Sequence, residues 1–368
     1  MPDILDRFKD PATARLLAEK LGKLEGEAVS IMEVCGTHTM AIFRYGIRSL
    51  LPESIRLVSG PGCPVCVTPV SFINAAIQLA KMKDVTITTF GDLMKVPGSY
   101  STLIDEKRNG ADIRIVYSPL DALDIAADEP SRRVVFLSVG FETTAPVSAL
   151  AVLRASERGL RNFSMLSANK TMPQAMRIIA GDGKSNIDGF LYPGHVCAIT
   201  GTSMAKEIAL EYGVPGVVTG FEPLDVLHGI ISLTELIRHK ENTVLNEYKR
   251  IVREEGNPTA LERLCEVFEP CDAVWRGFGS IPRSGLAVRA KYSGFDAWKV
   301  FGLREEAGHE PEGCMCPMVL TGRVTPDKCR LFGRQCTPES PVGACMVSSE
   351  GTCAAYYRYG TWKPDKEC

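Results

Sequence analysis

Short apolar runs that alternate with helical patterns are the feature that most limits how this chain can fold. Runs of strand length occupy residues 28–34, 55–59, 85–90, 113–117 and 134–139, and further runs follow at 163–166, 189–192 and 214–219. Short, continuously apolar strands separated by helices are typical of parallel sheets that are covered on both faces. These strands are too many for one small sheet, so the pattern predicts an α/β protein with two doubly wound, Rossmann-like domains joined near residue 130.

The chain of 368 residues is also too long for one ordinary core. Asp10 followed by Pro11 is typical of a helix start and predicts a lead-in helix that ends near Leu24. We expect that helix within residues 1–27, a first α/β domain at 28–129, a second at 130–240, and a helical segment with a small irregular domain at 241–368. From residue 270 onward the chain is rich in Gly, Pro and Cys, which is typical of a small domain held together by a metal cluster.

Charge and hydropathy exclude several classes of partner. Hydrophobic residues make up 45% of the chain and charged residues 23%, as in ordinary soluble globular proteins. The net charge is -2 and no block of Lys and Arg with interleaved aromatic residues occurs, so neither nucleic acid nor a membrane surface is expected as a partner. The first residues lack an apolar core of signal-peptide length, and the most apolar window, 134–153, is broken by Glu142 and Pro146. We therefore expect a cytoplasmic protein without a membrane anchor.

Thirteen cysteines indicate metal or redox chemistry, because cytoplasmic thiols are kept reduced and rarely form a structural disulfide framework. Four thiolates are enough for a cubane, and one C-terminal set has spacings of 12, 6 and 16 intervening residues: Cys316, Cys329, Cys336 and Cys353. Zinc usually prefers paired Cys-x2-Cys knuckles, which this region lacks, so the pattern favours a [4Fe-4S] cluster. Four basic residues among these cysteines would offset the negative charge of a cluster: Arg323, Lys328, Arg330 and Arg334.

Cys63-Pro64-Val65-Cys66 is a Cys-x-x-Cys motif at the end of a predicted strand, with a helix expected from about Pro69. A thiol that faces a helix start is exposed to the positive end of the helix dipole, which lowers its pKa and makes the thiolate available. The motif therefore predicts a pair that cycles between dithiol and disulfide. Half a zinc site is the alternative, but the chain contains no second Cys-x-x-Cys to complete one.

Further candidate residues follow other predicted strands, at the edge where open α/β sheets build their sites. Cys35 and His38 come after the first strand, and one helical turn would bring them to the same side. His195 follows a later strand, and the sequence Gly-Phe-Glu occurs after two strands, where it places Glu142 and Glu222. Each residue also has a plainer interpretation: a packed thiol, structural histidines, or acids that suit the starts of helices.

Taken together and in order, these motifs resemble one family. They are MEVCGTHT at 32–39, GPGCPVC at 60–66, GFETT at 140–144, PGHV at 193–196, GFEP at 220–223, and Leu-Phe-Gly at 331–333 before Cys336. The resemblance is to HypD, the iron-sulfur maturation protein of nickel-iron hydrogenases, and it extends from about residue 28 to 360.

The resemblance implies a maturation scaffold rather than a conventional turnover enzyme. On such a scaffold an iron that carries two cyanides and one carbon monoxide is assembled before delivery to the large subunit of a hydrogenase. It implies two direct partners, a small HypC-type chaperone whose N-terminal cysteine shares the iron and a HypE-type protein that donates cyanide. The hydrogenase large subunit is then an indirect partner.

The resemblance also implies roles for individual residues. Cys35 would bind the assembled iron with His38 beside it, and Cys63 and Cys66 would be the redox pair. The cluster ligands would be Cys316, Cys329, Cys336 and Cys353, with Cys345 as an extra thiol and Cys314 as the competitor of Cys316 for the first position. Proton transfer is the role expected of three residues from the other half: Glu142, His195 and Glu222.

Two other functions remain open at this point. A disulfide reductase that passes electrons from the cluster to a protein substrate explains the same cysteines but gives Cys35 no task. A zinc-stabilised binding module without redox function is the second. Radical chemistry on S-adenosylmethionine is disfavoured because no Cys-x3-Cys-x2-Cys occurs.

The remaining cysteines are interpreted as packing or surface thiols: Cys197, Cys265, Cys271 and Cys368. Tyrosines near Cys353 and the segment 275–277 are expected to shield the cluster from water.

Overall fold

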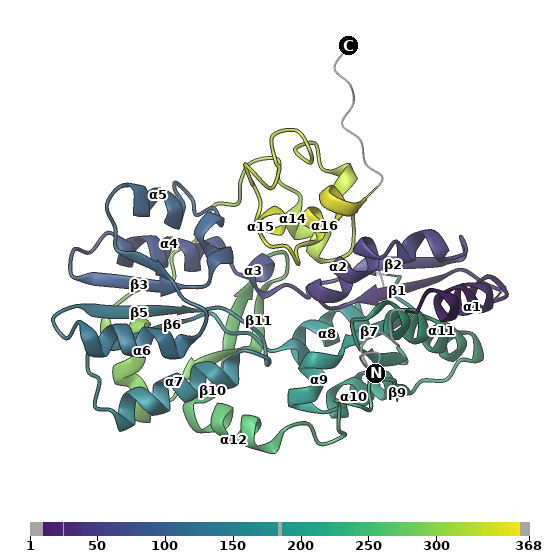
Figure 1. Ribbon diagram of the computed structural model, residues 1–368, viewed down its shortest axis with the longest axis horizontal. Coiled ribbons are helices and arrows are strands. Elements are labelled where there is room, and N and C mark those ends of the chain that lie inside the picture. Colours follow the sequence, from purple (N-terminus) through teal and green to yellow (C-terminus); the bar gives the residue numbers. More distant parts are fainter. Residues whose placement is uncertain (1–9, 25, 183–185, 361–368) are drawn as a thin grey trace, which may run out of the picture.

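The computed structural model describes residues 10–24, 26–182 and 186–360, and contains two parallel sheets in two lobes (Figure 1). Sheet A has the strand order β2-β1-β7-β8-β9, and sheet B has the order β4-β3-β5-β6. The strands of sheet A are β1 (Val29–Glu33), β2 (Ile55–Ser59), β7 (Gly189–Pro193), β8 (Gly216–Thr219) and β9 (Val244–Asn246). Those of sheet B are β3 (Val85–Thr89), β4 (Ile113–Ile115), β5 (Arg133–Ser138) and β6 (Phe163–Ser167). The predicted α/β class with two parallel sheets is confirmed.

Helices cover both faces of each sheet, as continuously apolar strands require. One face of sheet A is covered by α1 (Pro11–Gly22), α2 (Gly36–Arg44) and α11 (Pro223–His239), and the other by α8 (Met172–Gly181), α9 (Gly194–Thr200) and α10 (Ser203–Tyr212). Sheet B lies between α4 (Val70–Ala80) and α5 (Leu103–Arg108) on one face and α6 (Pro119–Asp128) and α7 (Ala145–Glu157) on the other. The predicted start of the first helix is confirmed, because the Asp10 carboxylate accepts a 2.8 Å hydrogen bond from the Thr13 N–H.

The assignment of strands to the two sheets differs from the one that their order in the chain predicts. A first domain at 28–129 would join β1 and β2 to β3 and β4, but β1 and β2 pair in sheet A with the later strands, and β3 to β6 form sheet B. The sheets therefore do not divide near residue 130. Apolar patterning identifies a strand by its burial, but it does not identify which neighbour supplies its hydrogen bonds.

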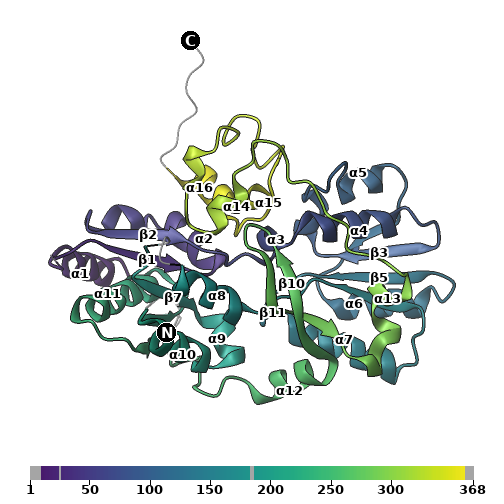
Figure 2. The ribbon, with the colours of Figure 1, turned by 180° about the vertical axis from the view of Figure 1, so that it is seen from behind.

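An antiparallel hairpin lies between the two lobes, where the sequence predicted an irregular segment (Figure 2). It consists of β10 (Phe268–Trp275) and β11 (Gly279–Val288), and α12 (Pro258–Val267) leads into it. At its tip the Arg276 N–H donates to the Val67 carbonyl, and Gly277 packs closely against the backbone of Pro317. The hairpin was missed because β10 is largely exposed and both strands contain proline, which weakens the apolar signal of a buried strand.

The C-terminal segment contains short helices and forms no sheet among the residues described up to 360. Its helices are α14 (Cys316–Leu320), α15 (Ala344–Val347) and α16 (Thr352–Tyr359), which pack against α2 and against α3 (Pro64–Val67). The other short helices are η2 (Ile47–Leu50), η3 (Gly91–Lys95), η4 (Ala290–Phe295), α13 (Ala297–Val300) and η5 (Pro326–Lys328). Figure 1 shows this segment above the junction of the two lobes.

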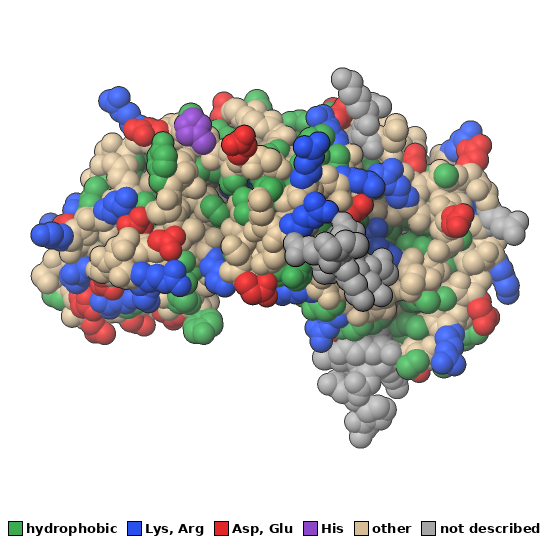
Figure 3. Space-filling view, turned by 90° about the horizontal axis from the view of Figure 1, so that it is seen from above, with side chains coloured by type: hydrophobic (Ala, Val, Ile, Leu, Met, Phe, Trp, Pro, Cys, Tyr) green, Lys and Arg blue, Asp and Glu red, His purple; other side chains and the backbone are tan. Residues whose placement is uncertain are grey.

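The surface above that junction carries basic side chains near the C-terminal segment and a mixture of acidic and basic side chains elsewhere (Figure 3). In the part of the chain that the structure describes, every helix is too short or too polar to cross a membrane.

Candidate functional site

The carboxyl edge of sheet A brings Cys35 and His195 together. β1 and β7 are neighbours, and the chain continues from β1 to β2 on one side and from β7 to β8 on the other, so the two residues flank the switch point of the sheet. Cys35 caps the start of α2, and His195 lies in the first turn of α9. The Cys35 Sγ atom is 4.0 Å from each ring nitrogen of His195. A buried thiol thus faces a half-buried imidazole.

His38 and Phe221 complete this edge. The His38 Nε2 atom is 2.9 Å from the Gly220 carbonyl oxygen, which fixes Nε2 as the protonated nitrogen. The Phe221 ring lies 4.7 Å from the His38 ring and 4.9 Å from the His195 ring. The second Gly-Phe-Glu motif therefore supplies a carbonyl and an aromatic ring that hold the two histidines. The structure brings His195, rather than His38, to the sulfur of Cys35.

Burial determines the protonation of these groups. It lowers the pKa of His38 to about 3 and that of His195 to about 4, so both imidazoles are neutral at pH 7. Burial, followed by the negative charge of Glu350, raises the pKa of the Cys35 thiol to about 12. Backbone N–H groups of Thr37 and His38 face the sulfur and oppose that rise. Without a metal, Cys35 is a protonated thiol beside a neutral proton acceptor.

Glu350 is a site residue that the sequence did not indicate. The Thr37 hydroxyl donates a 2.6 Å hydrogen bond to the Glu350 carboxylate. Gly36 leaves no room for a side chain there, because a Cβ atom would lie 2.5 Å from the Glu350 carbonyl oxygen. The C-terminal segment therefore covers the start of α2 beside Cys35. An acid in an irregular stretch, some 300 residues away in sequence, carries no local signal of this contact.

Cys63 and Cys66 lie at disulfide-bonding distance, with 5.2 Å between their Cα atoms, and both side chains are buried. The preceding Gly62 packs against the backbone of Cys35, and its carbonyl accepts a 3.1 Å hydrogen bond from the Gly36 N–H. On the other side, the Cys66 Sγ atom is 4.0 Å from the Ala344 carbonyl oxygen. The pair therefore lies between Cys35 and the C-terminal segment.

The C-terminal thiols gather next to that pair. Cys345 is fully buried, and hydrogen bonds with Cys316 and Cys353 lower its pKa to about 5. Cys314 is hydrogen-bonded to Cys316, and Cys336 is close enough for both to affect its pKa. Of the four predicted ligands, the structure thus brings three together: Cys316, Cys336 and Cys353. Cys345, interpreted from sequence as an extra thiol, lies in the middle of the group.

Cys329 lies at the edge of this group. Its thiol donates to the Gly313 carbonyl oxygen at 3.8 Å, next to Cys314. No group of three or more metal-binding side chains among residues 10–24, 26–182 and 186–360 has preformed metal-site geometry. The structure therefore gathers these thiols without forming a metal site, and the ligand set remains a prediction.

Comparison with known proteins is decisive for the family. The sequence model described as "HypD: Hydrogenase formation hypA family" matches residues 12–360. The chain belongs to the HypD family. It is 45% identical over 365 residues to a hydrogenase maturation factor HypD of Rhodobacter capsulatus, covering 96% of this chain and 97% of the relative. It is 43% identical to the hydrogenase expression/formation protein HupD of Azotobacter chroococcum mcd 1, covering 97% and 96%. It is also 43% identical to HypD of Escherichia coli (strain K12), covering 96% and 97%. The resemblance seen in the motifs is confirmed.

The two glutamates of the HypD-family chain are placed differently from Cys35 and His195. Glu142 follows β5 of sheet B, and its carboxylate accepts a 2.8 Å hydrogen bond from the Met172 N–H at the start of α8. Its second oxygen is buried and has no hydrogen-bond partner among the described residues. Glu222 caps the start of α11 beside Phe221. Their proposed part in proton transfer stays a prediction.

Other residues of the HypD-family chain have structural contacts. Tyr356 packs on Phe43 of α2 at 4.5 Å, and Trp275 stacks on Phe141 at 5.7 Å. Cys197 and Cys271 are buried or half-buried, and Cys265 is exposed. Cys368 lies outside the described residues. The aromatic residues therefore hold the C-terminal segment and the hairpin in place.

Replacing Glu142 with Gln is expected to stabilise the HypD-family chain at neutral pH. Burial raises the pKa of Glu142 from 4.5 to about 7, so the folded state holds a proton that the unfolded state releases, and stability falls as the pH rises from about 4.5 to 7. Gln keeps the acceptor for Met172 without that penalty, which is on the order of 3 kcal/mol above pH 7. Urea unfolding at pH 5 and pH 8 measures this, with the exposed Glu157→Gln as control. A stability difference that does not grow with pH would show that Glu142 is ionised at no cost.

Proposed function

We propose that this chain is a cytoplasmic maturation scaffold that assembles the Fe(CN)2CO group of nickel-iron hydrogenase with a HypC-type chaperone. In this proposal it uses a [4Fe-4S] cluster and the Cys63–Cys66 redox pair. The observation that carries the proposal is the succession of three groups of cysteines on segments that contact one another. Cys35 touches the segment of the redox pair, and Cys66 touches the segment of the C-terminal thiols. The names of the relatives, which are hydrogenase maturation factors, agree with it.

The C-terminal thiols fit the chemistry of an iron-sulfur cluster. Soft thiolates are the ligands that such clusters take, and the side chains gathered here are cysteines, buried and close to one another. Cys316, Cys329, Cys336 and Cys353 would hold the cluster. When bound, the cluster supplies single electrons at this position. The buried Arg276 lies close enough for its charge to lower the pKa of Cys345, so it also offsets the negative charge of a cluster.

Cys35 is the residue that would bind the iron substrate. Iron with cyanide and carbon monoxide ligands is soft, and a thiolate is a matched donor for it. Because the empty Cys35 is protonated, binding must displace its proton, and the neutral His195 imidazole 4.0 Å away is placed to accept it. The N–H groups of Thr37 and His38 that face the sulfur are donors for anionic ligands at the same place.

The partners in this proposal are a HypC-type chaperone that shares the iron and a HypE-type cyanide donor. The hydrogenase large subunit receives the product indirectly. Cys35 is only 2% exposed, and the segment that carries Glu350 covers the start of its helix. A partner's cysteine therefore reaches the iron only after this segment moves aside.

Infrared spectroscopy of the protein co-purified with its cellular partners tests the proposal. Stretching bands of metal-bound cyanide and carbon monoxide are expected. Their absence from every such preparation would leave a cluster-dependent disulfide reductase as the better function, although that function gives the Cys35 and His195 pair no task. A colourless preparation under argon would instead favour a zinc-stabilised module.

Cys63 and Cys66 are expected to cycle between dithiol and disulfide, because their geometry permits the bridge and Cys66 lies beside the C-terminal thiols. Alkylation before and after reduction, followed by mass spectrometry, should show a gain of two reactive thiols on the peptide that contains them. Cys265, which is exposed and distant in sequence, is the control and should label equally in both states. If no oxidised preparation contains the bridge, the pair is not redox-active.

A further inference from the structure

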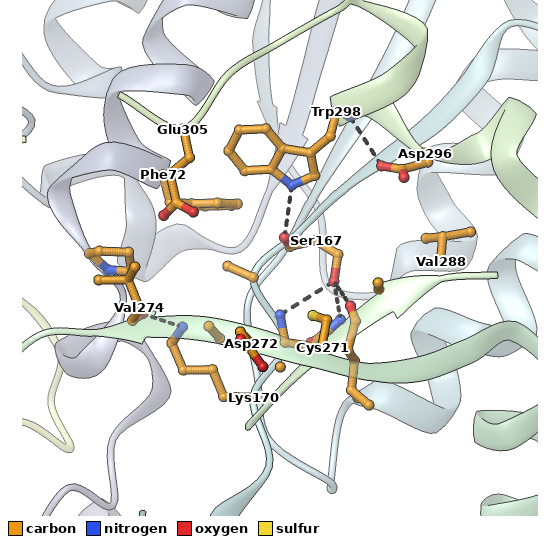
Figure 4. A pocket seen from close by; sticks show the side chains of 17 residues that line it. Phe72, Ser167, Lys170, Cys271, Asp272, Val274, Val288, Asp296, Trp298 and Glu305 are labelled. Atoms are coloured by element: carbon orange, nitrogen blue, oxygen red, sulfur yellow. Dashed lines mark hydrogen bonds between the residues drawn. The ribbon is translucent and has the colours of Figure 1, made fainter. Parts of the chain in front are cut away.

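The carboxyl edge of sheet B holds a cavity that the proposed function does not use. β6 ends at Ser167, and the following residues up to Lys170 form one wall of a cavity of about 250 Å3. The hairpin strands β10 and β11 form another wall. Figure 4 shows Phe72 and Trp298 on one side of the cavity and Lys170 and Cys271 on the other. Ligands of open α/β sheets bind beyond the carboxyl ends of the strands, which is where this cavity lies.

Lys170 is the unusual group in this cavity. It is only 3% exposed, and its Nζ atom donates a 2.8 Å hydrogen bond to the Val274 carbonyl oxygen and lies 5.6 Å from the centre of the Trp275 ring. Among the residues that the structure describes, no carboxylate forms an ion pair with it. A buried ammonium without a counterion is costly, so burial shifts the equilibrium of Lys170 toward the neutral amine.

The charges around Lys170 oppose that effect only in part. Burial lowers the pKa of Lys170 to about 8, while Glu305 and Cys271 act to raise it. The other titratable groups that line the cavity are Asp272 and Asp296. An appreciable fraction of Lys170 is therefore neutral and nucleophilic near pH 7, as it is in lysines that react with carbonyl compounds.

The lining also limits the class of ligand. Three carboxylates face or border the cavity, namely Asp272, Asp296 and Glu305, and they disfavour phosphates and other anions. Phe72 and Trp298 offer apolar surface. The volume suits a small molecule only. An uncharged, compact ligand agrees with all three observations.

We propose that this cavity binds a small uncharged carbonyl compound and that Lys170 reacts with its carbonyl carbon. The amine nitrogen forms a bond to that carbon, the carbon–oxygen double bond breaks, and an imine results. Both amine hydrogens leave with the oxygen as one water molecule. No oxidant or reductant is consumed. The step is independent of Cys35 and of the cluster, so it goes beyond the proposed maturation function.

Reductive trapping on the full-length protein tests this proposal. The protein is incubated with propanal and sodium cyanoborohydride at pH 7, and the modified lysines are mapped by mass spectrometry. The neutral fraction of Lys170 exceeds that of an ordinary exposed lysine on the order of 100-fold at pH 7. Lys170 should therefore be labelled well before Lys81 and Lys299, whose side chains are 61% and 57% exposed.

Two further measurements test whether Lys170 is a reactive amine or only a buried structural residue. The labelling rate of Lys170 should level off above about pH 8, whereas that of Lys81 should keep rising. Lys170→Arg keeps a donor for Val274 and should lose only this label, with circular dichroism as the check that the variant folds. If Lys170 reacts no faster than Lys81, or follows the same pH profile, it is a structural anchor and the proposal is wrong.

Discussion

Cys35→Ala is expected to remove the infrared bands of iron-bound cyanide and carbon monoxide from the co-purified protein, while the brown colour of the cluster remains. Cys35 comes from the end of β1, and its sulfur faces His195 rather than the C-terminal thiols. Its loss therefore removes the donor for the iron without removing a cluster ligand. A thiolate contributes charge and soft donation that alanine cannot replace.

Variants of residues near Cys35 test whether the effect is specific to its sulfur. Cys197→Ala is the matched control, because Cys197 is a buried thiol in α9 two residues after His195, and it should keep the bands. His195→Asn should weaken the bands more than His38→Ala, since His195 faces the sulfur and His38 is hydrogen-bonded to Gly220. Full-strength bands in Cys35→Ala would mean that the iron is held elsewhere, and the reductase would become the better account.

Replacing Cys316 or Cys353 with Ala is expected to release the iron of the cluster and to loosen the C-terminal segment. Metal binding also contributes to the free energy of folding of a segment that has short helices and no sheet of its own. Iron content should fall from about four atoms per chain to below one, and the segment should become sensitive to protease. Cys265→Ala, which changes an exposed thiol, should leave both unchanged.

Single variants of the remaining cysteines decide the ligand set. The sequence spacing predicts that Cys329→Ala and Cys336→Ala lose the cluster, and that Cys345→Ala and Cys314→Ala are milder. The central position of Cys345 between Cys316 and Cys353 makes it the direct competitor of Cys329. Iron loss in Cys345→Ala with retention in Cys329→Ala would replace Cys329 by Cys345 in the set. Iron loss in Cys314→Ala but not in Cys316→Ala would correct the first position.

The sequence predicted strands well where burial is continuous. β1, β5 and β7 are buried along almost their whole length and lie close to their expected positions. β9 has three residues at a sheet edge, and β10 is exposed or half-buried at every position except its two ends, so neither gave a continuous run. Which strands share a sheet depends on long-range pairing, which no local pattern encodes.

The same limit applies to the site. Cys35 and His195 were candidates because each follows a predicted strand, and they meet in the structure because β1 and β7 are neighbours in sheet A. The resemblance had implied His38, rather than His195, beside Cys35. Glu142 was a candidate for the same reason, but its strand belongs to sheet B, and its carboxylate instead anchors α8. Glu350 had no signal at all, since its contact with Thr37 depends on how the C-terminal segment packs.

The interleaving of the two sheets also sets an order of events during synthesis. Sheet B is formed by one continuous stretch and is complete once β6 has emerged, whereas β1 must wait for β7, and sheet A is finished only with β9. At ribosomal speeds of about 5–20 residues per second, the wait between β2 and β7 lasts roughly ten seconds. Throughout that interval the nascent chain carries the Cys35 motif without His195, Gly220 or Glu350 beside it. If Cys35 binds iron as proposed, loading is possible only after translation has passed all three, and a chain truncated before β7 has the motif without these neighbours.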